Sequence, residues 1–335
     1  MSTRTRLVVL AVVAALLAVV AAVYAARAAD EVREGTRTAE RAAAPSVQID
    51  LKQPGRLLVV TAGPGGGRVA SAGRSSPDGP RSVSGLECVR FYAASGTGVC
   101  LTAVRAAVAR FYAVTVDDRL RETRRIELPG APSRARVSAS GRMVSWTVFV
   151  NGDSYIGGGF STRTGILDTR TGAVVSTLED FTLYLKGSLH RASDVNYWGV
   201  TFAKDDNVFY ATVSTGGATY LVRGDFARRR LETLRENVEC PSLSPDGTRL
   251  VYKKKVRNAV GGPWRLHVLD LASGRDVELA EPASVDDQAA WLDDADVMYA
   301  RIRGENTTDV WTVPADGSGT PRLLARDARS PVAVT

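Results

Sequence analysis

Few residues of this chain could carry out chemistry, because it holds only two His and three Cys among 335 residues. His190 and His267 stand alone, and no spacing of His, Cys and carboxylates matches a zinc or EF-hand site. The glycine-rich run at 63–67 lacks the following helix and the Lys-Ser/Thr end of a phosphate loop, so it predicts a hairpin turn. Residues 152–157 do not have the Gly-x-Ser-x-Gly spacing of a nucleophilic serine. The sequence therefore predicts no catalytic residue, no metal ligand set and no cofactor.

The cysteines fit a structural role. Cys88 and Cys100 flank a short strand and a turn at 94–98, so they can face each other across a hairpin. We expect them to form a disulfide bond, which is typical of proteins outside the reducing cytoplasm. Cys240 precedes Pro241 in a predicted innermost strand, and we expect it to be a buried free thiol rather than a nucleophile.

Aromatic and charged side chains typical of recognition surfaces are concentrated in two stretches, residues 151–163 and 181–197. The predicted binding residues are Tyr155, Phe160, Arg163, Tyr184, His190, Arg191, Asp194 and Tyr197. The alternative is that both stretches cover the mouth of a channel and stabilise the fold. To predict where these side chains lie, the secondary-structure elements that carry them must first be identified.

A repeated segment identifies those elements. Residues 244–252 (SPDGTRLVY) have the pattern of a strand end, a Pro-Asp-Gly turn and the start of the next strand. Similar segments start at 138, 202 and 291, so successive starts lie 64, 42 and 47 residues apart. Each segment has an aromatic residue eight positions after its start: Trp146, Tyr210, Tyr252 and Tyr299. Four short strands in each repeat of this length, joined by tight turns, are typical of β-propeller blades.

The repeat predicts an all-β, six-bladed propeller over residues 48–335. Five units cover residues 85–130, 131–181, 193–235, 236–281 and 282–328. Residues 329–335 resemble the first strand of a blade, and residues 56–61 and 68–72 resemble second and third strands. Joined together, these strands give a composite sixth blade that closes the ring and removes exposed sheet edges. Seven blades are the alternative.

The strand order also predicts which connections share a face. In an antiparallel blade, the connection from second to third strand lies on the same side as the link to the next blade. Residues 151–163 fall in the first kind of connection and residues 181–197 in the second. Both stretches are therefore predicted on one face.

The turn motifs carry a resemblance to a known family. They occur in CPSLSPDGTRLVYKKK and WRLHVLDLASGRDVELAE within 240–281, and in TTDVWTVPADGSGTPRLLA at 307–325. These runs resemble the WD40-like repeats of TolB-type six-bladed propellers, and the resemblance covers residues 85–335. It implies the propeller fold without specifying a partner. TolB carries a separate α/β domain before its propeller, which residues 27–47 are too short to supply.

The N-terminal segment predicts the location. Residues 7–26 contain no charged side chain and follow Arg4 and Arg6, and about 20 residues can span a ~30 Å hydrocarbon core. Small residues near position 26 also suit signal peptidase. Residues 1–28 are therefore a signal anchor or a signal peptide, and residues 29–47 are a flexible linker. The propeller is expected outside the cytoplasm, either on a single-pass cell membrane protein or in secreted form.

The chain has a net charge of +7, and because its propeller is expected outside the cytoplasm, nucleic acid is not an expected partner. We expect a monomeric, non-catalytic propeller that acts as a binding scaffold for an envelope protein or a cell-wall polymer, and that contacts the membrane through its N-terminal helix. The alternative function is a metal-assisted hydrolase or lactonase in the central channel. Asp194, Asn196 and Asp286 are its candidate ligands.

Overall fold

The computed structural model describes residues 17–19, 23, 48–104, 109–150, 161–257, 261–304 and 307–334. The chain divides into two units, Met1–Ser46 and Val47–Thr335. In the first unit, residues 17–19 and 23 are helical, and the remainder of the predicted N-terminal helix lies outside the described residues. Within the described part of the chain, no helix is both long and apolar enough to cross a membrane.

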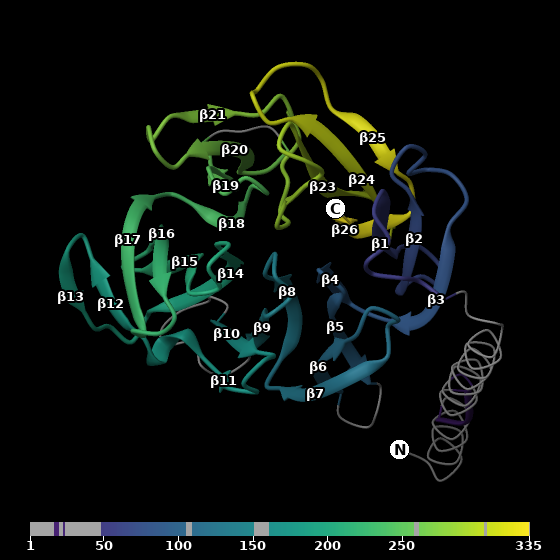
Figure 1. The fold of residues 1–335 in the computed structure, drawn as a ribbon, viewed down its shortest axis with the longest axis horizontal. Helices are drawn as coiled ribbons and strands as arrows, with labels where there is room; N and C mark the ends of the chain where they lie inside the picture. The colour runs from purple at the N-terminus through teal and green to yellow at the C-terminus, as the bar shows by residue number, and fades with distance from the viewer. Residues whose placement is uncertain are drawn as a thin grey trace, which may run out of the picture. The chain divides into compact units, whose positions relative to one another are not determined.

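The second unit contains six sheets arranged in a ring, shown in Figure 1. We number the sheets as blades I to VI and give their strands from the centre outward. Blade I contains β26 (Ala328–Val334), β1 (Arg56–Thr61), β2 (Arg68–Gly73) and β3 (Ser82–Glu87). Blade II contains β4 (Arg90–Ala94), β5 (Thr97–Val104), β6 (Arg110–Val116) and β7 (Glu122–Leu128). Blade III contains β8 (Ala131–Val137), β9 (Met143–Val150), β10 (Ser161–Asp168) and β11 (Val174–Val175).

The remaining three blades follow in chain order. Blade IV contains β14 (Asn196–Phe202), β15 (Val208–Thr215), β16 (Ala218–Asp225) and β17 (Arg230–Glu236), with β12 (Thr182–Leu185) and β13 (Ser188–His190) outside them. Blade V contains β18 (Glu239–Leu243), β19 (Arg249–Lys255), β20 (Trp264–Asp270) and β21 (Asp276–Glu278). Blade VI contains β22 (Ala290–Trp291), β23 (Asp296–Gly304), β24 (Thr307–Pro314) and β25 (Arg322–Ala325).

The ring closes through the composite blade that the sequence predicts. The C-terminal strand β26 pairs antiparallel with β1, so that Arg56 lies opposite Val334 and Thr61 lies opposite Ala328. The six-bladed arrangement is confirmed, and the seven-bladed alternative is wrong. The repeated aromatic residues all lie on the second strand of their blades, namely β9, β15, β19 and β23.

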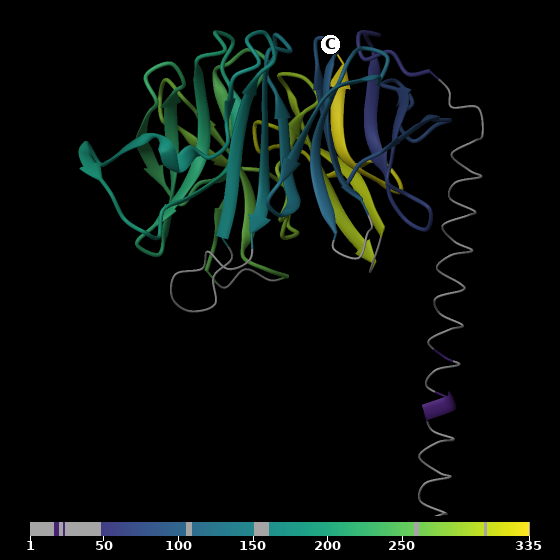
Figure 2. The ribbon, with the colours of Figure 1, turned by 90° about the horizontal axis from the view of Figure 1, so that it is seen from below.

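Each tight turn has a local cause. In the turn at 244–248, the Gly247 N–H donates to the Ser244 carbonyl at 2.9 Å, and Gly247 has a φ of +83° that favours glycine. The glycine-rich run after β1 is a hairpin turn, as predicted, closed by the Gly66 N–H and the Gly63 carbonyl at 2.9 Å. We call the side that carries the 244–248 turn the turn face. The opposite side, where second strands end and third strands begin, is the loop face (Figure 2).

The core lies between the blades. Strands such as β1 (RLLVVT) are buried on both faces of their sheet. Alternate side chains of a strand point to opposite faces, and each face packs against a different neighbouring blade. Leu58 and Val60 pack in a cluster shared with blade II, whereas Leu57 and Val59 pack in a cluster shared with blade VI. Apolar clusters of this kind fill all six junctions between neighbouring blades in the described part of the chain.

Residues 178–190 depart from the predicted arrangement. A short 3-10 helix, η1 (Leu178–Asp180), is followed by β12, which pairs in parallel with β17 at the outer edge of blade IV (Figure 1). The hairpin of β12 and β13 therefore widens blade IV to six strands. The prediction of a face loop for this stretch is wrong, because backbone pairing to a strand about fifty residues later in the chain fixes it at the rim.

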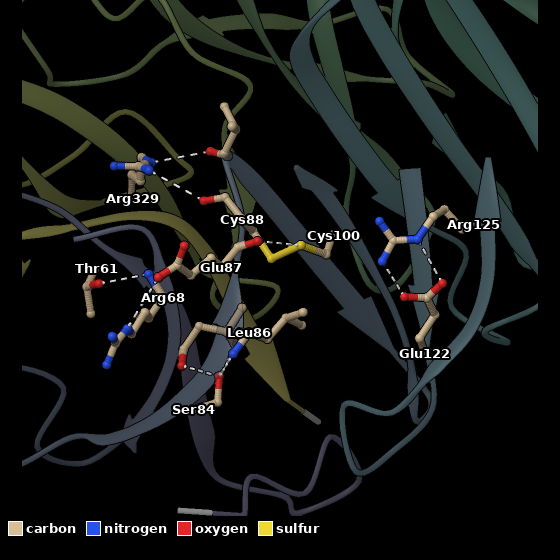
Figure 3. Close-up of a disulfide and its surroundings, with 12 residues drawn as sticks. Thr61, Arg68, Ser84, Leu86, Glu87, Cys88, Cys100, Glu122, Arg125 and Arg329 are labelled. Carbon is tan, nitrogen blue, oxygen red and sulfur yellow. Dashed lines mark hydrogen bonds and ion pairs between the residues drawn. A yellow bond between two sulfur atoms is a disulfide. The ribbon is translucent and has the colours of Figure 1, made fainter. Parts of the chain in front are cut away.

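The predicted disulfide between Cys88 and Cys100 is confirmed, with Cα atoms 5.3 Å apart (Figure 3). Cys88 directly follows β3, the outermost strand of blade I, and Cys100 lies on β5 of blade II. The bond thus fixes the link between these two blades. The Arg329 guanidinium, from β26, donates to the Val89 carbonyl in the same link at 3.3 Å.

Candidate functional site

The centre of the ring is crossed by residues 286–289, which precede the short strand β22. The Asp287 carboxylate lies 3.1 Å from Nη1 of Arg90 on β4 and 3.7 Å from Nη1 of Arg134 on β8. The Gln288 amide donates to the carbonyls of Val200 on β14 at 3.3 Å and Pro241 on β18 at 2.9 Å. The crossing segment is therefore held by blades II, III, IV and V, and it divides the central channel.

Two pockets and a small cavity between them lie along the channel. The loop-face pocket, of about 420 Å³, is lined by Arg134 together with aromatic side chains. A middle cavity of about 30 Å³ shares Arg134 with it and extends to Arg136 and Tyr92. The turn-face pocket, of about 460 Å³, shares Arg136 and Tyr92 with the middle cavity. The crossing segment thus separates two open pockets by a narrow polar cavity.

The loop-face pocket combines aromatic walls with charged groups. Phe149, Trp198 and Trp264 line it, and Phe149 is 40% exposed. The Lys253 ammonium lies 4.5 Å from the centre of the Trp264 ring, a cation–π contact, and it pairs with Asp286. This arrangement presents broad apolar rings beside buried charge, which suits recognition of an amphipathic group.

Two carboxylates on this side balance Lys253. Glu239 Oε2 lies 3.8 Å from Nζ of Lys253, and burial raises the pKa of Glu239, although the ammonium opposes this. Asp286 is exposed at the pocket rim and lies 4.0 Å from Nη2 of Arg134. The rim therefore carries both signs of charge.

Cys240 lines the same pocket but is buried, as predicted for a free thiol. Its φ is +50°, in the left-handed region, and its backbone N–H donates to the Thr212 hydroxyl at 2.8 Å. Gly199 lies against this backbone, since a Cβ there would approach the Cys240 Cα to 2.8 Å. The close packing of β14 on β18 thus depends on glycine at position 199.

The predicted binding residues do not gather around the channel. Tyr155 and Phe160 lie outside the described residues. Arg163 is half-buried on β10, and Tyr197 is buried on the innermost strand β14, 1% exposed, so it is not a surface residue. Burial also raises the pKa of the Tyr197 hydroxyl.

The other four predicted residues lie on or just after the hairpin of blade IV. The Tyr184 ring is 3.8 Å from the Arg230 guanidinium carbon. Asp194 accepts from the Thr215 hydroxyl at 2.8 Å and the Gly216 N–H at 2.6 Å, and the backbone bond is the main reason its pKa is lowered. Such bonds hold the β15–β16 turn. His190 and Arg191 line a separate pocket of about 450 Å³ that Tyr197 also borders.

The three side chains predicted to bind a metal in the alternative hydrolase each contact a different partner in the protein. Asp194 holds the β15–β16 turn, Asn196 accepts from the Thr162 N–H at 3.0 Å, and Asp286 pairs with Lys253. No group of three His, Cys, Asp or Glu side chains placed to hold a metal ion occurs among the residues that the structure describes.

Sequence reasoning missed the residues that line the channel centre, namely Arg90, Arg134, Arg136, Asp287 and Gln288. The sequence of the first strand of blade III could have indicated them. Arg134 and Arg136 alternate there with small or apolar residues, and alternate positions of an innermost strand share one side. Charged residues repeated at that spacing indicate a polar channel lining.

These features define a TolB-like six-bladed β-propeller with a closed, charged channel. The sequence matches no family model and no curated protein. TolB from Acinetobacter baumannii is similar in structure, with a TM-score of 0.57 and 17% identity over 83% of this chain. This chain spans 66% of the length of that TolB.

Two further solved structures are similar. A chain of a nidogen/laminin complex has a TM-score of 0.51 and 12% identity, covering 82% of this chain and 95% of that chain. A puromycin-hydrolysing peptidase of Mycobacterium tuberculosis has a TM-score of 0.49 and 15% identity, covering 78% of this chain and 42% of that chain. At such identities the similarity to TolB and to the nidogen/laminin chain shows the fold alone.

Proposed function

We propose that this chain is an extracytoplasmic, non-catalytic scaffold that binds a partner protein of the cell envelope at the loop-face pocket. The observation that carries the proposal is the grouping of Phe149, Trp198 and Trp264 around Arg134 and Lys253. Trp and Arg are the residues that most often dominate binding energy at protein interfaces, and pockets lined by them accept an anchoring side chain of the partner.

Exposed apolar side chains on the same face support a protein partner. Val104, Phe149 and Ile302 lie near the loop-face ends of the second strands of blades II, III and VI. Their exposed fractions are 44%, 40% and 83%. Phe149 lines the pocket, and exposed large apolar side chains on one face are typical of interaction surfaces. A partner that covers the pocket would also bury some of this surface.

The compartment is inferred from two independent features. The Cys88–Cys100 disulfide is typical of proteins outside the reducing cytoplasm. The uncharged segment at 7–26 predicts export, either with a retained membrane anchor or after cleavage. Similarity in fold to TolB and to a chain of the nidogen/laminin complex is consistent with a binding role.

Site-specific photo-crosslinking of the full chain in its native cells tests the proposal. Benzoylphenylalanine placed at Phe149 is expected to capture one protein reproducibly. The control is the same probe at Leu234, which is 51% exposed on the outer strand β17. Capture of the same proteins from both positions, or no capture from position 149, would contradict the proposed surface.

A further inference from the structure

The middle cavity of the channel is lined by polar donors whose hydrogen-bonding capacity is not used. Nε of Arg134, Nε of Arg136 and Oγ of Ser330 are buried and have no hydrogen-bond partner among the described residues. All three residues line this one cavity. A buried donor without a partner costs free energy, so three of them around one hollow point to a ligand that accepts hydrogen bonds.

Arg136 is the most buried of these groups. The residue is 4% exposed, its Nη2 donates to the Ala289 carbonyl at 3.3 Å, and its guanidinium carbon lies 4.3 Å from the centre of the Tyr92 ring. No carboxylate lies within ion-pair distance of Arg136 in the part of the chain that the structure describes. A buried guanidinium in such surroundings is stabilised by an anion.

The charges around the cavity are unbalanced toward positive. Arg90 and Arg134 share the carboxylate of Asp287, and Asp286, which also pairs with Lys253, lies 4.0 Å from Arg134. Arg136 adds a further positive charge that has no ion pair among the described residues. Arg329 lies close by, and burial, together with the charge of Arg90, lowers the pKa of its guanidinium. The channel centre therefore has an excess of positive charge that the protein itself does not neutralise.

The size of the cavity and the shape of its donors restrict the ligand. A volume of about 30 Å³ accommodates roughly two water-sized groups. Guanidinium N–H groups match the two oxygens of a planar carboxylate. We propose that the middle cavity binds a carboxylate group, held by Arg134, Arg136 and Ser330. A small free carboxylate and a glutamate side chain of a bound partner share this chemistry, so the proposal does not depend on the protein-binding role.

Thermal unfolding of the full chain in sodium formate tests this proposal. A ligand that binds only the folded state raises the melting temperature with the logarithm of its concentration, by about 2–5 °C per tenfold increase above its Kd. Sodium chloride and sodium isethionate at equal ionic strength are the comparison salts. We expect the rise in formate to exceed that in either. Equal rises in all three salts, a chloride effect that matches formate, or no rise would overturn the proposal.

Variants connect the effect to the cavity. Arg136→Gln should remove the formate-specific rise, whereas Arg170→Gln, which removes the same charge from an exposed turn, should retain it. If Arg136→Gln does not fold, Ser330→Ala should still weaken the formate response. A response that is unchanged in Ser330→Ala and in any folded Arg136→Gln would overturn the assignment.

N-acetylglutamate methylamide then distinguishes the two sources of the carboxylate. Stabilisation of the chain by this compound supports a glutamate side chain of a partner, and stabilisation by formate alone supports a small free carboxylate.

Discussion

Asp287 and Arg90 form an ion pair at the centre of the propeller, with 3.1 Å between Oδ1 and Nη1, although they are 197 positions apart in sequence. The two residues belong to blades VI and II, which are separated in the ring by the composite blade I. Arg134, on the first strand of the neighbouring blade III, lies 3.7 Å from the same carboxylate. A single carboxylate thus connects three blades at the point where the channel is closed.

Replacing that carboxylate should destabilise the ring. Asp287→Asn removes the carboxylate that pairs with Arg90 and one of the two carboxylates near Arg134, and breaking a buried pair in this way costs about 3–5 kcal/mol. Urea unfolding should show a loss of this order. The control is Asp316→Asn, whose partner Ser318 belongs to its own exposed turn and whose loss should be well below 1 kcal/mol. Similar losses in both variants would argue against the cross-channel role.

The same pair predicts an acid dependence. Burial opposes ionisation of Asp287, but the charges of Arg90 and Arg134 outweigh it, so the pKa in the folded state is lowered. The contribution of this group to stability is therefore complete above the unfolded pKa of about 3.9 and is lost as the pH falls through the lower folded value. In Asp287→Asn, unfolding free energy should depend less on pH in this acidic range. An unchanged dependence would contradict the assignment.

His267 predicts a second, separate pH effect. It is buried, its Nδ1 lies 3.1 Å from Asp276, and burial lowers the pKa of the ring although Asp276 opposes this. As the pH falls, this ring is therefore protonated near pH 6.5 in the unfolded chain but only at lower pH in the folded chain. The free energy of unfolding thus decreases as the pH drops below about 6.5. His267→Gln should remove that part of the dependence, and a dependence unchanged by this substitution would contradict the assignment. Proton NMR titration of the ring provides the direct check.

The disulfide is expected to contribute to stability because it closes a short loop between blades I and II. Replacing both Cys88 and Cys100 by Ala should lower the free energy of unfolding by about 3 kcal/mol. Mass spectrometry of non-reduced digests should find the linked peptide in the native chain, with Cys240 alkylated only after denaturation. Rapid native alkylation of Cys240, or free thiols at both other positions, would contradict the structure.

The closing strand can be tested with two matched valines. Val332 on β26 is 2% exposed and packs between blades I and II, whereas Val174 on β11 is 38% exposed. Val332→Ala should cost about 2 kcal/mol through lost burial and a cavity, and Val174→Ala less than about 0.5 kcal/mol. Chemical denaturation measures both. Equal losses would mean that β26 is not an integral part of the ring.

The sequence predicted the ring because each blade is largely specified locally. A turn such as 244–248 fixes the pairing register of β18 and β19, and Tyr252 then follows at a constant position. The C-terminal strand could also be predicted, since residues 329–335 have the pattern of a first strand with no partner nearby in sequence. Each of these inferences used neighbours within one or two blades.

The site could not be predicted in the same way. In the sequence, residues 286–289 resemble an ordinary loop before a strand, and no local pattern indicates that they cross the channel. Their position depends on Arg90 and Arg134, which lie more than 150 residues earlier. The hairpin of β12 and β13 was missed for the same reason, because β12 pairs with the distant strand β17. Contacts between segments far apart in sequence leave no periodic signal.

The affinity of the crosslinked partner for a Trp264→Ala variant tests the central claim most directly. Trp264 forms a wall of the loop-face pocket and stacks against Lys253, so its removal should weaken binding by about 30-fold, as for an interface hot spot. Leu234→Ala, on β17 and not among the residues that line the pocket, should bind like the unmodified chain. With both variants shown to be folded by their melting curves, an affinity unchanged by Trp264→Ala would contradict the assignment of this pocket as the binding site.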